Sequence, residues 1–261
     1  MLTFARATNL GASRATGTFL FLLNDDAAVE GRAVERLAQA FAAEPGMGAV
    51  GGYLVNPDGS PQPSAYAYPS WRALAELILR PVFRFPPLGR LARYPYPRPP
   101  AREGAEFWLS GAALMVRRKL FEEVGGLDDG YPHGVEDAVL CRAMRERGYS
   151  VAVVPDARIL HGGGTSGYWS RVSSERVSKA LIGGAAGWLR YWEVNGAGRL
   201  SRTALRLALL LFGLSRLVAY AIGSLVPGPW HERQRFRRDA YLGYMRWILS
   251  GRGNDAQSAQ A

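Results

Sequence analysis

The sequence has one cysteine, Cys141, and only two lysines, Lys119 and Lys179, among its 32 basic residues. A single cysteine excludes an internal disulfide bond and a cluster of thiolate metal ligands, and so little cysteine favours a reducing compartment. The first residues, MLTFARATNLGASRATG, contain no continuous apolar segment. We therefore expect no secretory signal peptide.

Long apolar runs without charge are also absent. The longest apolar stretch, LALLLFGLSRLVAYAIGSLV over residues 207–226, is interrupted by Arg216 and preceded by Arg206. Because a membrane-spanning helix needs roughly 20 mostly apolar residues with few charges, we do not predict a spanning helix here.

The chain does contain enough apolar residues for a core, since they make up 48% of its 261 residues. This suits one large α/β domain, alone or with an appendage. The formal charge of +10 favours polyanionic partners such as nucleotide phosphates, anionic lipid or nucleic acid, although a GC-rich coding sequence would produce the same arginine bias. No RNA- or DNA-binding motif is recognisable, so we expect no nucleic-acid partner.

Apolar periodicity predicts a sheet between helical layers. In the segment TFLFLL, residues 18–23, the side chains that would point to either face of a strand are apolar, as in a strand buried on both faces. Val34, Leu37, Ala38 and Phe41 recur at helical spacing, and MGAVGGYLV supplies the next strand. A strand, a helix and a strand in this order predict a parallel pair of strands.

The middle of the chain lacks this periodicity. Residues 56–100 are rich in proline and aromatic residues, with only a short helix expected around residues 71–80. A long irregular segment inside a compact domain is usually functional, so we interpret it as a loop over the site. A simple insertion is the alternative.

Further elements follow this segment. FWLSGAALMVRRKLFEEVGG predicts a strand and a short helix that ends at its glycines, and GVEDAVLCRAMRERGYS predicts an amphipathic helix. YSVAVVPDARILHGGGTS predicts a strand pair or hairpin before a glycine loop, and only helices are expected beyond Ser173. We therefore divide the chain into an α/β domain over residues 1–172, a helical region over residues 173–250 and a disordered tail over residues 251–261.

Acidic residues and a histidine stand where these elements begin or end. Asp25 and Asp26 follow a strand, Glu136 and Asp137 open a helix, and His161 ends a strand. Carboxylate and phosphate oxygens suit Mg²⁺ or Mn²⁺, and Mn²⁺ also accepts imidazole. Each feature also has an ordinary structural role: a turn or N-cap, a charge that complements a helix dipole, or loop polarity.

Four segments carry a more specific signal: FARATNLGASRATGTFLFLLNDDA, WLSGAALMVRRKLFEEVGGLDDGY, GVEDAVLCRAMRERGY and ILHGGGTS. In their order and spacing they resemble the family 2 glycosyltransferases of the GT-A fold, in particular the bacterial rhamnosyltransferase-like branch. The resemblance covers about residues 3–170. It implies an α/β fold with a mixed sheet flanked by helices, and an enzyme that uses a nucleotide-sugar donor.

The resemblance places the nucleotide and metal site at the LNDD corner. Asn24 and Asp26 take the positions of the family's DxD-type motif, and Asp25 faces away or braces the turn. His161 resembles the histidine that completes the metal site, where Mg²⁺ or Mn²⁺ would stabilise the diphosphate leaving group. Asn9 is assigned to the same nucleotide-binding set.

Asp137 matches the family's general base, which accepts the proton of the acceptor hydroxyl while that oxygen attacks the anomeric carbon. Attack from the face opposite the nucleotide inverts the configuration in a single displacement. Glu136 would orient this base or bind acceptor hydroxyls.

A turn of small residues, Ser110, Gly111 and Ala112, resembles the family's turn beneath the donor sugar and acceptor. Small residues there allow a sugar ring to approach the backbone closely. Trp108 would stack on a sugar face, and a core tryptophan is the alternative.

Two departures from the family pattern affect these inferences. The family often has an acidic residue two positions after the base, where this chain has Val139. Family members also begin with nucleotide-contacting strands some tens of residues before the position of Phe4, and this chain does not show them. We expect that translation starts upstream of Met1; the alternative is a relic completed by a partner.

The helical region separates basic from apolar residues. At 100° per residue, Arg199, Arg202, Arg206 and Arg216 fall within about a 100° arc, with leucines over the remainder. Such a helix suits a membrane interface, and WHERQRFRRDAYLGYMRWIL adds a second basic and aromatic helix that suits anionic lipid. A helix packed on the catalytic domain is the alternative.

The sequence therefore predicts an inverting, metal-dependent glycosyltransferase that is cytoplasmic and peripheral at the inner face of the cell membrane. Its donor would be dTDP-rhamnose or a UDP-sugar, and its acceptor a cell-envelope polysaccharide or a lipid-linked glycan. Rhamnose rests on the resemblance alone. The alternative is a non-catalytic subunit that binds glycan or membrane.

Overall fold

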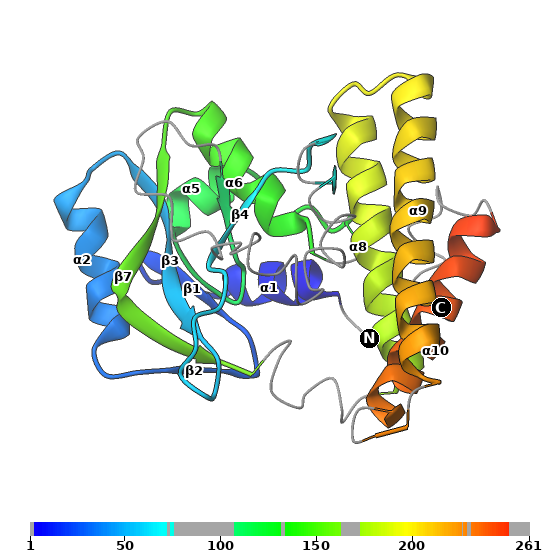
Figure 1. Ribbon diagram of the computed structural model, residues 1–261. Helices are drawn as coiled ribbons and strands as arrows, with labels where there is room; N and C mark the ends of the chain where they lie inside the picture. The colour runs from blue at the N-terminus through cyan, green and yellow to red at the C-terminus, as the bar shows by residue number, and fades with distance from the viewer. Residues whose placement is uncertain are drawn as a thin grey trace. The chain divides into compact units, whose positions relative to one another are not determined.

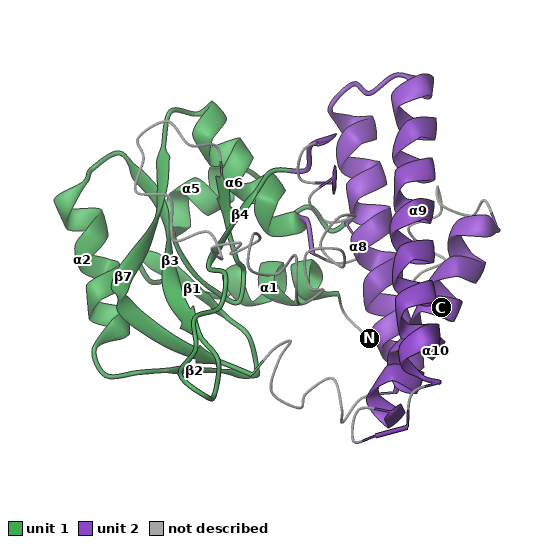
Figure 2. Ribbon diagram, in the orientation of Figure 1, with its two compact units in different colours: residues 1–68, 94–129, 136–169 green, residues 69–93, 130–135, 170–261 purple. Residues whose placement is uncertain are grey.

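The computed structural model describes residues 3–71, 74–75, 107–131, 134–162, 173–225, 227–228 and 231–250. The chain divides into two compact units (Figure 2). Residues 1–68, 94–129 and 136–169 form the α/β unit, and residues 69–93, 130–135 and 170–261 form the helical unit. Two segments that precede the expected boundary near Ser173 thus belong to the helical unit.

A five-stranded mixed sheet forms the centre of the α/β unit (Figure 1). Its strands lie in the order β1-β6-β3-β7-β2. Within this sheet β3 and β7 pair in parallel, and the other three pairs are antiparallel. Its strands are β1 (Phe19–Leu23), β2 (Ala27–Val29), β3 (Met47–Val55), β6 (Ala113–Arg117) and β7 (Ser150–His161).

Helices cover both faces of this sheet. The apolar cluster on one face joins Leu114 and Val116 of β6 to α1, α5 and α6, and the cluster on the other face joins Ala113 and Met115 to α2. This division follows from the two-residue period of a strand. The bounds of these helices are α1 (Phe4–Ala12), α2 (Ala33–Ala43), α5 (Arg118–Glu123) and α6 (Glu136–Glu146). The predicted mixed sheet between helical layers is confirmed.

Two expectations about strands are wrong. β1 and β3 run in the same direction but are not a pair, because β6 lies between them and pairs antiparallel with both. Residues 150–161 form one long strand instead of a hairpin. The register of β7 against β3 shifts between Gly52 and Tyr53, so the residues around Pro155 bulge out of the ladder without reversing the chain.

A small second sheet pairs β4 (Ala65–Ala67) with β5 (Phe107–Leu109) in antiparallel fashion. Most of the expected loop over residues 56–100 lies outside the described residues, as do the tail over residues 251–261 and the glycine loop beyond Gly162. Of the helix expected over residues 71–80, residues 71, 74 and 75 are described, and they are helical.

The helical unit contains α8 (Ser174–Val194), α9 (Arg199–Gly223) and α10 (His231–Leu249). Ser173 caps α8, because its hydroxyl accepts a hydrogen bond from the N–H of Arg176. The buried core of the unit consists of Leu74, Ala185, Leu189, Leu205, Leu209, Phe212, Tyr244 and Met245.

The two sides of α9 differ sharply in exposure. Leu205, Leu209 and Phe212 are buried, whereas a set of large apolar side chains is exposed: Leu200, Leu207, Leu211, Leu214, Val218 and Ile222. At 100° per residue this set, called here the α9 apolar face, spans about an 80° arc. By length and composition α9 is able to cross a membrane, since its most apolar 18-residue window has a mean hydropathy of 1.8 and is 28% buried.

The arginine stripe expected on α9 does not form one exposed surface. Arg216 is only 8% exposed, and its guanidinium carbon lies 5.3 Å from the centroid of the Phe212 ring. A planar, weakly hydrated guanidinium stacks well on an aromatic ring, which favours this burial. In helical projection the arginines lie opposite the α9 apolar face, and of the four only Arg199 is exposed, so the most exposed side of the helix is apolar.

Candidate active site

The acidic corner is positioned by the ends of β1 and β2. The N–H of Asn24 donates a 3.0 Å hydrogen bond to the carbonyl of Ala112, and the carbonyl of Asn24 accepts one from the N–H of Ala27 at 3.1 Å. This turn leads the chain from β1 into β2 with Asp25 and Asp26 at its tip. Asp25 is exposed and Asp26 is half-buried.

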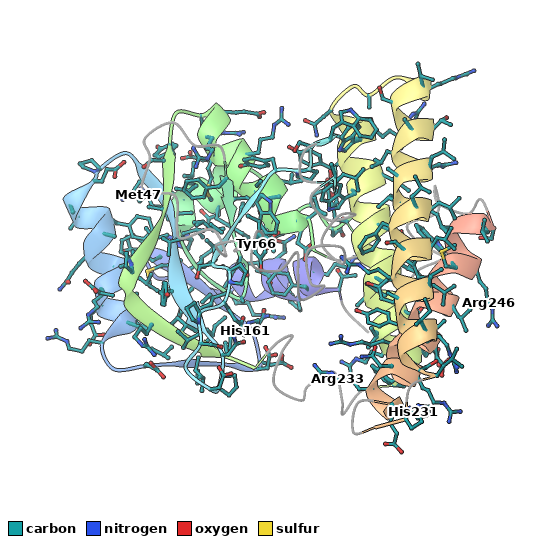
Figure 3. All side chains as sticks on the ribbon, viewed as in Figure 1. Met47, Tyr66, His161, His231, Arg233 and Arg246 are labelled. Atoms are coloured by element: carbon teal, nitrogen blue, oxygen red, sulfur yellow. The ribbon has the colours of Figure 1, made fainter. Side chains whose placement is uncertain are left out.

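Strand pairing brings His161 to this corner (Figure 3). Ala27 lies opposite His161 in the β2–β7 ladder, and the N–H of Gly162 donates a 2.8 Å hydrogen bond to the carbonyl of Asp26. Nε2 of His161 lies 3.3 Å from Oδ1 of Asp26 and 3.3 Å from Nδ2 of Asn24. The structure thus places three of the sequence-derived candidates together, although they are far apart in the sequence.

Asp137 lies in the first turn of α6 and is 8% exposed. Its Oδ2 accepts a 2.9 Å hydrogen bond from the N–H of Gly111, and its Oδ1 accepts one of the same length from the N–H of Ala138. The residue after Gly111 is Ala112, whose carbonyl binds the N–H of Asn24. A two-residue backbone segment therefore connects Asp137 to the acidic corner.

Burial and, to a smaller extent, the neighbouring charge of Glu136 raise the pKa of Asp137 to about 7, even though the N–H donors of Gly111 and Ala138 lower it. Glu136 is itself 5% exposed, so two carboxyl groups share the buried start of α6. A carboxyl group whose pKa lies near neutrality accepts protons more readily than an ordinary aspartate does.

Gly111 permits a close approach of the backbone to this carboxyl group. A Cβ atom at this position would lie 3.3 Å from Oδ2 of Asp137 and 3.4 Å from the ring of Phe4. Ser110 anchors the same turn, because its N–H donates a 3.0 Å hydrogen bond to the carbonyl of Ser64. The expected turn of small residues therefore lies against the candidate base.

Trp108 belongs to an aromatic pair on the small sheet. Its ring stacks on Tyr66 with centroids 4.7 Å apart, and its Nε1 donates a 3.1 Å hydrogen bond to the carbonyl of Ala67. Tyr66 is 38% exposed. The pair thus offers an aromatic surface two residues before Ser110, and Tyr66 is a candidate that periodicity in the sequence did not single out.

Asn9 braces the fold. Its Nδ2 donates to the carbonyl of Leu127 at 2.7 Å, and its Oδ1 accepts from the N–H of Leu127 at 2.9 Å. This bridge joins α1 to the turn after Gly126, which has a φ of 75°. The assignment of Asn9 to nucleotide binding stays a prediction.

Gln62 is a further site residue that the sequence did not indicate. Its Oε1 lies 2.8 Å from Nδ1 of His161, and its Nε2 donates a 2.7 Å hydrogen bond to the His161 carbonyl. The N–H of Gln62 donates to the carbonyl of Leu54 at 2.9 Å, which holds this residue at the end of β3. The segment NPDGSPQP indicates a turn, but no spacing connects it to the histidine.

The acidic corner fits a divalent cation that also binds a substrate. Within the described residues, no group of three or more His, Cys, Asp or Glu side chains is arranged to hold a metal ion. Asp26 and His161 place an oxygen and an imidazole nitrogen 3.3 Å apart, close to the roughly 3 Å that separates adjacent ligands of an octahedral ion bound at about 2.1 Å. Mg²⁺ sites of this kind complete their coordination with water and substrate phosphates.

Comparison with known proteins identifies the family of the chain. Residues 3–179 match the family described as glycosyltransferase-like family 2. The N-acetylglucosaminyl-diphospho-decaprenol L-rhamnosyltransferase of Mycobacterium tuberculosis is 35% identical over 129 residues, which are 49% of this chain and 41% of that protein. The O-antigen biosynthesis protein RfbC of Myxococcus xanthus is 28% identical over 156 residues, or 59% of this chain and 12% of that protein. The chain thus matches less than half the length of these curated relatives.

Two solved structures are similar at low identity. The mannosyltransferase PcManGT from Pyrobaculum calidifontis, in complex with GDP-Man and Mn²⁺, is 18% identical with a TM-score of 0.43, over 92% of this chain and 66% of that one. GalNAc-T7 with UDP, GalNAc and Mn²⁺ is 16% identical with a TM-score of 0.46, over 97% of this chain and 44% of that one.

Proposed function

The chain belongs to glycosyltransferase-like family 2, and we propose that it transfers a sugar from a nucleotide donor to a hydroxyl group of a lipid-linked glycan, with inversion. One observation carries this proposal. The N–H of Gly111 binds Asp137, while the carbonyl of the next residue, Ala112, binds Asn24. A candidate base and a candidate diphosphate site therefore lie at the two ends of one short turn, as a direct displacement requires.

Asp137 is proposed as the catalytic base. The proton of the acceptor hydroxyl passes to a carboxylate oxygen of Asp137 while the hydroxyl oxygen forms a bond to the anomeric carbon. The bond between that carbon and the diphosphate oxygen breaks, and the nucleoside diphosphate leaves with the electron pair. The N–H groups of Gly111 and Ala138 hold the carboxylate during this transfer.

Asp26 and His161 would hold a divalent cation, either Mg²⁺ or Mn²⁺, with Asn24 beside them. A bound cation stabilises the negative charge of the diphosphate leaving group. Asp26 is half-buried and His161 is packed beside it, so both ligands are positioned before substrate binds. Such preorganisation lowers the cost of stabilising a developing charge.

The donor and acceptor that we propose are taken from the names of the curated relatives. The Mycobacterium tuberculosis protein is named as an L-rhamnosyltransferase for N-acetylglucosaminyl-diphospho-decaprenol. We therefore propose dTDP-rhamnose as the first donor to test, with UDP-sugars next, and a polyprenyl diphosphate glycan as the acceptor. The aromatic pair of Trp108 and Tyr66 is a candidate surface for a sugar ring.

A lipid-linked acceptor would require access to a membrane. The α9 apolar face is exposed, and the arginines of α10 supply positive charge that favours anionic lipid. We propose that the helical unit binds the inner face of the cell membrane peripherally, with the α9 apolar face in the interface.

The test is a transfer assay with the full chain. The protein is incubated with dTDP-L-rhamnose, a short polyprenyl-diphospho-N-acetylglucosamine and Mn²⁺, and the product is identified by mass spectrometry. The Asp137→Asn variant is expected to lose at least a hundredfold in rate but to retain donor binding. Asp156→Asn makes the same chemical change at an exposed site and should retain activity. Full activity of Asp137→Asn would contradict the assignment of Asp137 as the base, whereas no transfer by the wild type with any donor would favour a non-catalytic glycan- or membrane-binding subunit.

A further inference from the structure

Hydrogen bonds form a continuous chain from an exposed turn to His161. The hydroxyl of Ser60 donates to Oδ1 of Asp58 at 2.5 Å, and Nδ2 of Asn56 donates to Oγ of Ser60 at 2.8 Å. Nε2 of Gln62 donates to Oδ1 of Asn56 at 2.5 Å, and Oε1 of Gln62 lies 2.8 Å from Nδ1 of His161. These five residues are called here the His161 relay.

Asp58 determines which group donates and which accepts in each hydrogen bond of the relay. A carboxylate only accepts hydrogen bonds, and the hydrogen bonds from Ser60 lower the pKa of Asp58 and keep it ionised. The Ser60 hydroxyl must therefore donate to Asp58 and accept from Asn56. This identifies the Asn56 atom that faces Ser60 as the amide nitrogen, so the amide oxygen of Asn56 faces Gln62.

The orientation of the Gln62 amide follows from its two hydrogen-bond acceptors. Its nitrogen donates both to Oδ1 of Asn56 and to the carbonyl of His161, so its oxygen is the atom that faces Nδ1 of His161. An amide oxygen accepts only, and Nδ1 must therefore carry a proton. A neutral His161 is consequently the Nδ1–H tautomer, and its unprotonated nitrogen is Nε2.

Nε2 is also the nitrogen that faces the acidic corner. It lies 3.3 Å from Oδ1 of Asp26, and the amide nitrogen of Asn24, a donor, lies at the same distance. In the Nδ1–H tautomer the lone pair of Nε2 therefore faces an oxygen of Asp26 at 3.3 Å. Two acceptors in that position repel each other unless a proton or a cation lies between them.

We propose that Gln62 is a positioning residue that holds neutral His161 in the Nδ1–H tautomer, with the Nε2 lone pair beside Asp26, and thereby raises the affinity of this corner for a divalent cation. The cation itself belongs to the proposed function, on which this inference rests. The relay turn is held by two hydrogen bonds of 2.8 Å that Asn56 donates to Ser60, one from its backbone N–H to the Ser60 carbonyl and one from Nδ2 to Oγ. A rigid turn on β3 would thus prepare a ligand on β7 before the cation arrives.

The first test reads the tautomer directly and needs neither metal nor substrate. Two-bond ¹H–¹⁵N spectra of histidine-labelled protein, recorded above pH 8, distinguish the protonated ring nitrogen from the unprotonated one, and loss of a signal set in His161→Gln assigns His161. We expect Nδ1–H in the wild type and a shift towards Nε2–H in Gln62→Ala. Gln39→Ala removes the same side chain from an exposed position on α2 and should leave the spectrum of His161 unchanged. An unchanged tautomer in Gln62→Ala would overturn the proposal.

The second test measures Mn²⁺ affinity by electron paramagnetic resonance with the same variants and no nucleotide. Removal of a partner that orients a metal ligand typically weakens binding by about 10–100-fold, so Gln62→Ala should lie in this range and Gln39→Ala should match the wild type. A tautomer shift without loss of Mn²⁺ affinity would overturn the link to the cation. A failure of sugar transfer would leave both readouts unaffected, so it contradicts the proposed function alone.

Discussion

The N–H of Gly111 lies 2.9 Å from Oδ2 of Asp137, and this hydrogen bond joins the turn before β6 to the first turn of α6. It stabilises the ionised form of a carboxyl group that burial and Glu136 otherwise keep neutral. The carboxyl group is therefore held in place but is only weakly acidic. Both properties suit a group that must accept a proton during catalysis.

The stability of the protein should depend on pH through Asp137. Its pKa is raised in the folded state, so its contribution to stability is fully present below the unfolded value near 4 and is lost as the pH rises through about 7. Asp137→Asn removes this dependence. The melting temperature of the variant should rise relative to the wild type between pH 5 and pH 9, by about 3 °C or more.

Cys141 should not contribute to this pH effect. It lies one turn further along α6, and burial raises the pKa of its thiol to about 12, so it stays neutral over this range. The contribution of the Asp137 carboxyl group is obtained by measuring the melting temperature at several pH values, both in the wild type and in a Cys141→Ala background. A constant difference in melting temperature between Asp137→Asn and the wild type would contradict the raised pKa.

Gly111→Ala should disturb the base without removing it. The added methyl group would lie 3.3 Å from Oδ2 of Asp137 and 3.4 Å from the Phe4 ring, so one of these neighbours must move. We expect a loss of about 1–2 kcal/mol in the free energy of unfolding and a lower rate of sugar transfer. Gly11→Ala is the control, because nothing lies within 4 Å of its added methyl group and alanine favours a helix by up to about 1 kcal/mol. Equal stability of the two variants would contradict the tight packing at Gly111.

Asp26 should couple nucleotide binding to a divalent cation. We expect that calorimetric titration of the wild type with dTDP shows binding that strengthens about tenfold or more with Mn²⁺ and weakens again when EDTA removes it. Asp26→Asn removes the negative charge of one ligand, so the effect of Mn²⁺ should largely disappear. Asp156→Asn should behave as the wild type does. Binding that is indifferent to EDTA in the wild type would exclude a cation at the acidic corner.

The α9 apolar face should mediate membrane binding. Leu211 is 57% exposed on this face, and Leu211→Glu places a charge where the proposed interface is apolar. Flotation with vesicles that contain anionic lipid should show at least a threefold loss of bound protein, since a charged side chain is costly to bury in an apolar environment. Ala219→Glu adds the same charge on α9 at an exposed position outside this face. Equal flotation of the two variants would show that charge alone, and not the apolar face, determines binding.

The elements of the α/β unit were largely predictable because their signals are local. The continuous apolar run of residues 18–23 predicted β1, the segment MGAVGGYLV predicted β3, and the positions of Glu136 and Asp137 at the start of α6 follow from helical periodicity. The pairing of β6 between β1 and β3 was not predictable in this way, because it depends on contacts between distant segments. The bulge near Pro155 misled the strand assignment for the same reason, since a break in local pattern does not show whether the chain reverses.

Local patterns in the sequence were enough to identify the chemical groups of the candidate site, because Asp26, Asp137 and His161 stand where elements with clear apolar periodicity begin or end. The proton affinity and the orientation of these groups depend instead on contacts between distant segments, which only the folded chain brings together. Burial beside Glu136 sets the proton affinity of Asp137, and Gln62, from a turn on β3, sets the tautomer proposed for His161 on β7. Packing likewise buried Arg216 and left leucines exposed on α9. Each of these effects arises from desolvation or a long-range hydrogen bond, and neither leaves a regular spacing in the sequence.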